Sequence, residues 1–206
     1  MSIMGSALPT LLVFPQERPV FLREYSTDHY STFAYFLSRF VIEAFTTAIQ
    51  MLLVALLSYY LIGFQSGLGW HFLVLYALAM SSTALAVLLG SAVEDPKLAT
   101  EFLPLLFVPQ FLFAGFFVNP ELIPSWLRWA QWVCTLTYGV KLRLYYEWGS
   151  GCGTPADATK TTCNLLKSLD VNSDEVWWYW VMLIALFLAF RLAALFVLST
   201  KATKFY

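Results

Sequence analysis

The sequence has few charged side chains. Only 12% of its 206 residues are Asp, Glu, Lys or Arg, and the net charge is −1, whereas a soluble domain carries about 25% charged residues. This shortage excludes a basic surface of the kind that binds nucleic acid or anionic lipid. Hydrophobic residues make up 59% of the chain and aromatic residues 18%. The composition therefore predicts lipid, not water, as the main solvent.

The motifs of common enzymes are also missing. The sequence contains no G-x-x-x-x-G-K-[ST] phosphate loop, no H-E-x-x-H and no G-x-S-x-G. The two histidines, His29 and His71, are expected near opposite faces of the membrane, which makes a shared catalytic or metal site implausible. We therefore expect no enzymatic activity, no cofactor and no metal site in this chain.

Long apolar runs determine the expected fold class. A membrane-spanning helix needs about 20 apolar residues, and only helices and closed barrels satisfy the backbone in hydrocarbon. The runs lack the alternation of barrel strands, so they predict an all-α polytopic membrane protein. The expected transmembrane helices cover residues 33–63, 68–93, 98–118 and 176–199.

The positions of basic residues predict the orientation of the helices. Lys and Arg near both chain ends, and Lys97 in the link between the second and third spans, place these parts in the cytosol. Residues 119–175 are then extracellular. Residues 3–14 are too short to span the membrane. A signal peptide is one interpretation, but no basic residue precedes the run and no cleavage site follows it. We favour the end of an earlier helix, which would make the chain part of something larger.

The expected extracellular segment begins with an aromatic stretch. Within residues 121–148, Trp126, Trp129 and Trp132 recur at helical spacing. This pattern fits a helix that lies at the outer membrane interface. It fits equally a re-entrant pair of short helices packed on the spans. The residues alone leave both interpretations open.

Three cysteines follow in this segment. Cys152 and Cys163, here called the loop cysteines, lie in a polar stretch. We expect a disulfide between them, because an extracellular setting allows oxidation and closing so short a loop stabilises it by about 3 kcal/mol. Cys134 lies in the aromatic stretch and is expected to be a buried free thiol.

Ionisable residues within spans are costly and often functional. Glu43 lies four residues after Arg39, a spacing that favours a local salt bridge. Arg191 precedes Ser199 by eight residues, which places it about 12 Å inside the membrane. Its side chain can extend toward the inner interface or pair with a carboxylate on another span. The first arrangement is the default expectation.

Several motifs, in order, resemble those of a known transporter family. They are "FPQERPVFLREYSTDHYSTFAYFLSRFVIE" (14–43), "FAGFFVN" (113–119), "IPSWLRWAQWVCTLTYGV" (123–140) and "YYEWG" (145–149). Together with the loop cysteines, they resemble the white/ABCG subfamily of ABC transporters. The similar region is the C-terminal part of the transmembrane domain, from the end of helix two through helix six.

The resemblance implies the permease portion of an ATP-driven exporter of lipids, sterols or other hydrophobic compounds. It implies an ATP-binding domain outside this chain, where ATP and Mg would bind, and a second half-transporter as homo- or heterodimer partner. The protein would lie in the plasma membrane or an internal membrane. The alternative is a non-transporting membrane interaction module or a truncated dominant-negative fragment.

The resemblance also assigns roles to individual residues. Residues 16–30 would form a cytosolic connecting helix in contact with the ATP-binding domain. Phe116 and Phe117, here called the gate pair, would close the path toward the outside. Pro104, Val108 and Phe111 would line the substrate cavity. The coupling set of the connecting helix would consist of Glu17, Arg18, Phe21, Arg23 and Glu24.

Overall fold

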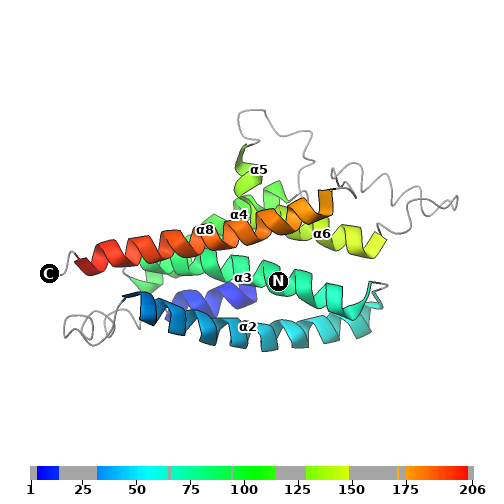
Figure 1. Cartoon of the computed structure of the whole chain (residues 1–206), viewed down its shortest axis with the longest axis horizontal. Helices are drawn as coiled ribbons and strands as arrows, with labels where there is room; N and C mark the ends of the chain where they lie inside the picture. Colours follow the sequence, from blue (N-terminus) through cyan, green and yellow to red (C-terminus); the bar gives the residue numbers. More distant parts are fainter. Residues whose placement is uncertain are drawn as a thin grey trace, which may run out of the picture. The chain divides into compact units, whose positions relative to one another are not determined.

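Every regular element in the described part of the chain is helical, which confirms the all-α fold class. The computed structural model describes residues 4–13, 32–64, 66–93, 95–114, 129–148, 171 and 175–203. A short apolar helix, Met4–Val13, comes first. The helices that follow (Figure 1) are α2 (Thr32–Ile62), α3 (Leu68–Ala92), α4 (Pro96–Phe113), α5 (Trp129–Val133), α6 (Thr135–Trp148) and α8 (Val176–Thr203).

Three of these helices are long and apolar enough to cross a bilayer. The candidate spans are Phe33–Ile62, Leu68–Ala92 and Val176–Lys201. They agree closely with three of the four spans predicted from the sequence. The chain is therefore an integral, multi-pass membrane protein.

The fourth predicted span corresponds to α4. Asp95 caps this helix, because its Oδ1 accepts a hydrogen bond from the Lys97 backbone N–H at 3.0 Å. Pro96 occupies the first helical position, where its missing N–H costs nothing. The helix has 18 residues, or about 27 Å at 1.5 Å per residue. It ends at Phe113, and residues 115–128 lie outside the described part, so the predicted span to residue 118 stays a prediction.

The helices divide into two compact units. The first comprises Met1–Met51, Ala79–Leu105 and Phe187–Tyr206, and the second comprises Leu52–Leu78 and Leu106–Leu186. Four helices, α2, α3, α4 and α8, contribute residues to both units.

The first unit is built around apolar contacts between α2, α3 and α8. Its central cluster consists of Phe36, Val87, Ala194 and Leu198, all buried. The two residues from α8, Ala194 and Leu198, are four positions apart, so they lie on the same face of that helix. At the end of α3, the Lys201 ammonium donates to the Ala92 carbonyl at 2.7 Å. A cation at this position satisfies a carbonyl that has no partner within the helix.

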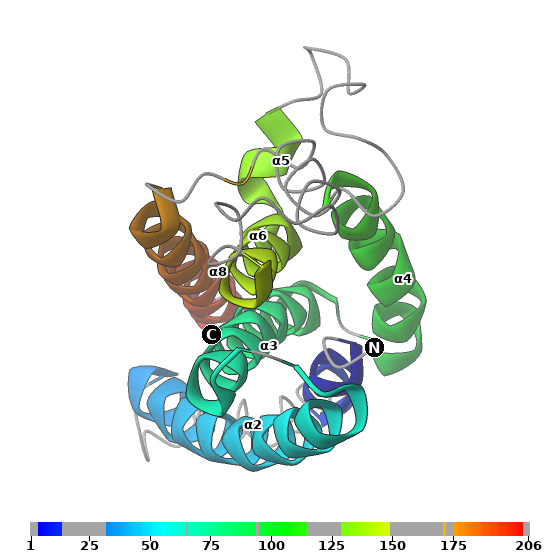
Figure 2. The same ribbon diagram turned by 90° about the vertical axis from the view of Figure 1, so that its right-hand side faces the viewer.

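The short helix Met4–Val13 also belongs to the first unit. It lies beside α2, as the dark blue and blue ribbons show in both views (Figures 1 and 2). The Gln50 side-chain amide of α2 donates to the Gly5 carbonyl at 3.3 Å. Ala7 and Leu11 are fully buried. The helix is found where the sequence predicted a partial helix at residues 3–14.

The second unit contains the two short helices α5 and α6. Helix α6 buries one side, including Leu142, which has no exposed surface. Gly139 faces Leu78 of α3 so closely that a Cβ there would lie 2.7 Å from the leucine Cδ1. A contact this close favours glycine, because a Cβ at this position would displace the end of the Leu78 side chain. Helix α6 thus packs on α3 within this unit, and the choice between an interfacial and a re-entrant helix stays a prediction.

Aromatic and polar contacts join α6 to α8 within the second unit. Lys141 lies 5.3 Å from the centre of the Tyr179 ring. The Trp180 indole N–H donates to the Tyr146 hydroxyl at 3.3 Å. The rings of Tyr138 and Tyr179 have their centres 6.4 Å apart. These contacts place the aromatic residues of α6 against the first turns of a span.

Candidate functional site

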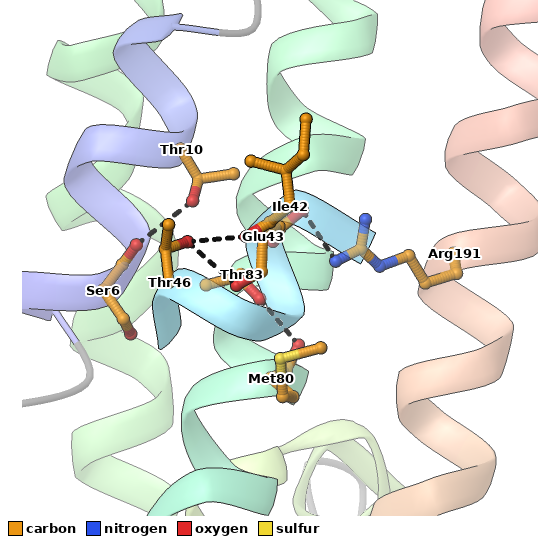
Figure 3. A network of polar contacts seen from close by, with 8 residues as sticks. All are labelled: Ser6, Thr10, Ile42, Glu43, Thr46, Met80, Thr83 and Arg191. Carbon is orange, nitrogen blue, oxygen red and sulfur yellow. Dashed lines mark hydrogen bonds and ion pairs between the residues drawn. The ribbon is translucent and has the colours of Figure 1, made fainter. Parts of the chain in front are cut away.

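A buried ion pair joins α2 to α8 in the first unit. The Arg191 Nη2 lies 2.8 Å from Glu43 Oε2, and the two side chains are only 7% and 5% exposed. Figure 3 shows the guanidinium of α8 directed at the carboxylate of α2. The expectation that Arg191 extends toward the interface is therefore wrong. The alternative, pairing with a carboxylate on another span, is what the structure contains.

Aromatic rings surround the guanidinium of Arg191. Its central carbon lies 5.1 Å from the Phe40 ring, 5.6 Å from the Phe187 ring and 5.8 Å from the Phe36 ring. Each ring face attracts the cation electrostatically. The rings also exclude water, so the pair lies in a setting of low polarity. Such a setting strengthens the attraction between the charges but makes each charge expensive to bury.

The ion pair is incompletely hydrogen-bonded. Glu43 Oε1 and Arg191 Nε are buried and have no hydrogen-bond partner among the described residues. The contact at 2.8 Å also lacks the alignment of a hydrogen bond. Buried polar atoms in folded proteins are nearly always satisfied. The pair is thus an exception that calls for a physical explanation.

Hydroxyl groups near the pair donate hydrogen bonds to backbone carbonyls of their own helices (Figure 3). A helical Ser or Thr hydroxyl can bond a carbonyl three or four residues earlier, which leaves its hydrogen unavailable to a neighbour. The hydroxyl of Thr46 follows this pattern, with the carbonyls of Ile42 at 3.0 Å and Glu43 at 3.1 Å. Two more examples are Thr10 to the Ser6 carbonyl at 3.2 Å and Thr83 to the Met80 carbonyl at 2.9 Å.

Helix α4 has one packed side and one exposed side. The packed side consists of Leu103, Phe107, Gln110 and Ala114, all at most 5% exposed. Of the predicted cavity residues, Pro104 lies on the exposed side, Val108 is 53% exposed, and Phe111 is half-buried. Other exposed apolar residues of α4 are Phe102, Leu105 and Leu112, and the first turns of the helix also expose the charged residues Lys97 and Glu101. Exposure alone does not test the cavity assignment, which stays a prediction.

The amide of Gln110 is used within the second unit. Its Oε1 accepts a hydrogen bond from the Thr135 hydroxyl at 3.2 Å. One turn further along α4, the Phe113 carbonyl accepts from the Thr137 hydroxyl at 3.3 Å. Both donors lie in the first turn of α6. The polar residue at depth in α4 therefore fixes the start of α6 within this unit.

A second polar cluster in the second unit combines residues of α2, α3 and α6 with Phe64 of the loop between α2 and α3. The Ser58 hydroxyl and His71 Nε2 are 2.8 Å apart in a hydrogen bond. Arg143 of α6 lies 4.0 Å from the centre of the Phe64 ring and 3.7 Å from Glu147. Burial lowers the pKa of Arg143, an effect that the nearby Glu147 carboxylate opposes. No sequence pattern indicates this cluster, because its members are up to about ninety residues apart.

Cys134 is a buried free thiol, as predicted. Burial raises the pKa of the thiol to about 11, so the reactive thiolate form is suppressed at neutral pH. Among the described residues no group of three or more His, Cys, Asp or Glu side chains is placed to hold a metal ion. The coupling set, the gate pair and the loop cysteines all lie outside the described residues.

Comparison with known proteins identifies the family. The family model described as "ABC-2 type transporter" matches residues 1–148. Protein white of Ceratitis capitata is 27% identical over 212 residues, covering 97% of this chain and 31% of the relative. ABC transporter G family member 1 of Dictyostelium discoideum is 26% identical over 219 residues, covering 97% and 28%.

A mammalian relative is similar over a shorter region. The broad substrate specificity ATP-binding cassette transporter ABCG2 of Sus scrofa is 28% identical over 148 residues, covering 69% of this chain and 22% of the relative. The chain spans less than a third of the length of these curated relatives. Because the family model matches most of the chain and white/ABCG proteins align with nearly all of it, the chain belongs to the ABC-2 type transporter family, as a transmembrane domain of the white/ABCG subfamily.

Proposed function

We propose that this chain forms part of the translocation path of an ATP-driven exporter for lipids, sterols or other hydrophobic compounds. The observation that carries the proposal is the exposed side of α4 in a chain of this family. Leu105 is 67% exposed there and Val108 is 53% exposed. A path lined by such side chains suits a hydrophobic compound, because ligand sites are mostly apolar with a few polar groups.

The exporter is completed by parts outside this chain. An ATP-binding domain supplies the site for ATP and Mg, and a second half-transporter supplies the other side of the path. Support comes from the relatives of Dictyostelium discoideum and Sus scrofa, which are named as ABC transporters and are more than three times as long as their aligned regions. The packed side of α4 is already occupied within the chain. Its exposed side is the one available to a second half or to a substrate.

Reconstitution of the full-length transporter tests the proposal. Purified protein in proteoliposomes should move a fluorescent sterol or a fluorescent phospholipid when ATP and Mg are added, and should stop when hydrolysis is blocked. Failure to move either probe, in folded protein that hydrolyses ATP, would contradict the exporter assignment. That result would favour the alternative of a non-transporting membrane module.

A pair of matched substitutions tests the place of α4 in the path. Val108→Trp adds bulk where the substrate should pass, so transport should fall. Val41 of α2 is 59% exposed, a close match to the 53% of Val108, and Val41→Trp should leave transport unchanged. Equal effects of the two substitutions would remove Val108 from the path.

A further inference from the structure

The atoms of the buried ion pair that lack hydrogen bonds match one another geometrically. The Nε and Nη2 groups of a guanidinium lie along one edge, at a spacing that matches the two oxygens of a carboxylate. In this structure Nη2 is 2.8 Å from Oε2, but neither these two atoms nor Nε and Oε1 have a hydrogen-bond partner among the described residues. The atoms without hydrogen bonds are thus the two donors and two acceptors that a side-on, two-bond pair would use.

The surroundings of the pair allow such a rearrangement. The contacts between α2 and α8 around Arg191 are ring faces, including Phe40 and Phe187, whose ring centres are 6.0 Å apart. Apolar and cation–π contacts depend weakly on direction, so they tolerate small displacements better than hydrogen bonds do. Thr46 bonds its own helix and does not hold the carboxylate in place. A slide or rotation of α8 against α2 would change how the guanidinium and the carboxylate face each other, and these contacts do not oppose it.

We propose that the Glu43–Arg191 pair is a two-position connector between α2 and α8, with one contact in this conformation and two parallel hydrogen bonds in another conformation of the transport cycle. The proposal rests on the proposed function, since it assigns the second position to that cycle. Residues 14–31, which include the coupling set, directly precede α2. A displacement of the N-terminal end of α2 would be transmitted to α8 through the ion pair. Glu43 and Arg191 are therefore positioning residues for transport.

Cross-linking tests whether α2 and α8 must move. Cysteines introduced together at Phe40 and Phe187 can be joined by a short thiol reagent, with the linked peptide identified by mass spectrometry. The linked full-length transporter should lose most of its ATP-dependent probe movement, and cleavage of the linker should restore it. In each of the two single-cysteine variants, treatment with the reagent should leave transport at the rate that the same variant has before treatment. Full transport in the linked protein would overturn the proposal.

The second test concerns the two-bond arrangement itself. Lysine keeps the charge and a single contact, but its ammonium cannot form the side-on pair. Arg191→Lys should lower transport per ATP hydrolysed by about three- to thirtyfold, the range for residues that modulate coupling. The neighbouring Leu192 is 65% exposed, and Leu192→Ala serves as the control that should change nothing. Normal coupling in Arg191→Lys would overturn the proposal.

The experiments distinguish failure of the connector proposal from failure of the exporter assignment. ATP-dependent probe movement by the unmodified full-length protein establishes the exporter first. A linked protein that transports normally then refutes the connector while the exporter assignment stands. If the unmodified protein moves no probe, the exporter assignment fails, and the connector of its cycle fails with it.

Discussion

Removal of Glu43 should strongly destabilise the protein. Glu43→Leu leaves the guanidinium of Arg191, whose side chain is 7% exposed, without its anionic partner among three aromatic rings. An Arg at the centre of a membrane helix costs about 2.5–3.5 kcal/mol on the insertion scale. Loss of one partner of a buried pair costs about 3–5 kcal/mol. The rings lie beside Arg191 in both proteins, so they do not offset this difference.

The expected destabilisation is therefore about 3 kcal/mol. For a domain of this size, each kcal/mol lowers Tm by about 2–4 °C, so Tm should fall by about 6–12 °C. Thermal unfolding of the full-length protein in lipid nanodiscs, followed by intrinsic tryptophan fluorescence, measures the shift. A matched control is Glu101→Leu on α4, where the carboxylate is exposed. That substitution should change stability by no more than about 0.5 kcal/mol.

A double variant separates the charge effect from the loss of packing. Glu43→Leu combined with Arg191→Met removes both charges and keeps apolar volume at both positions. Replacement of a complete buried pair is often neutral or stabilising, so Tm should return to near its original value or above it. The reasoning is refuted if Glu43→Leu shifts Tm no more than Glu101→Leu. It is also refuted if the double variant is as unstable as the single one.

Four further predictions concern other parts of the chain. The loop cysteines should form a disulfide within one chain, which mass spectrometry of unreduced peptides from surface protein detects; free thiols at both positions would contradict it. Glu17→Ala or Arg23→Ala should lower transport per ATP without changing ATP binding, and an unchanged ratio in both variants would exclude the coupling role. Replacement of both residues of the gate pair by Ala should raise ATPase activity and alter transport at normal surface abundance, whereas unchanged values would remove the pair from the gate. Gly139→Leu should cost about 1–3 kcal/mol by overpacking, because a Cβ there lies 2.7 Å from Leu78 Cδ1; a Tm equal to that of the unmodified protein would show that this contact relaxes freely.

The positions of the spans were predictable because they depend on local properties. Length and apolarity of a single segment decide whether it can satisfy its backbone in lipid. The spans at Phe33–Ile62, Leu68–Ala92 and Val176–Lys201 follow these properties directly. Helix α4 also begins where its local signals indicate, with Asp95 as cap and Pro96 at the first position. No contact with a distant residue is needed for any of these features.

The packing of α6 could not be decided from the sequence. Its aromatic residues suit an interfacial helix and a packed re-entrant helix equally, since both place rings beside polar groups. The contact that packs α6 on α3 is the close approach of Gly139 to Leu78, two residues more than sixty positions apart in the sequence. The Gly alone indicates only that close approach is permitted there. It does not indicate which helix makes the approach.

The buried ion pair shows where a simple sequence argument was incomplete. The spacing of Arg39 and Glu43 favoured a local salt bridge, and that inference used only one helix. The depth of each charged residue along its helix is a further indication of which charges can meet. Glu43 is 11 residues from the start of α2 at Thr32 (43 − 32), and Arg191 is 12 residues from the end of α8 at Thr203 (203 − 191). At 1.5 Å per residue these distances are about 16 and 18 Å.

If the start of α2 and the end of α8 both face the cytosol, as the basic residues indicate, the two charges lie at nearly the same depth. Two opposite charges at one depth in a bilayer have a strong reason to meet, because each is expensive to bury alone. Matching the depths of opposite charges across all spans therefore predicts the contact between Arg191 and Glu43 at 2.8 Å. It does not predict that Nε and Oε1 remain unpaired, because that detail depends on how α2 and α8 are rotated about their axes. The depth of the pair follows from the sequence, whereas its incomplete bonding follows only from tertiary packing.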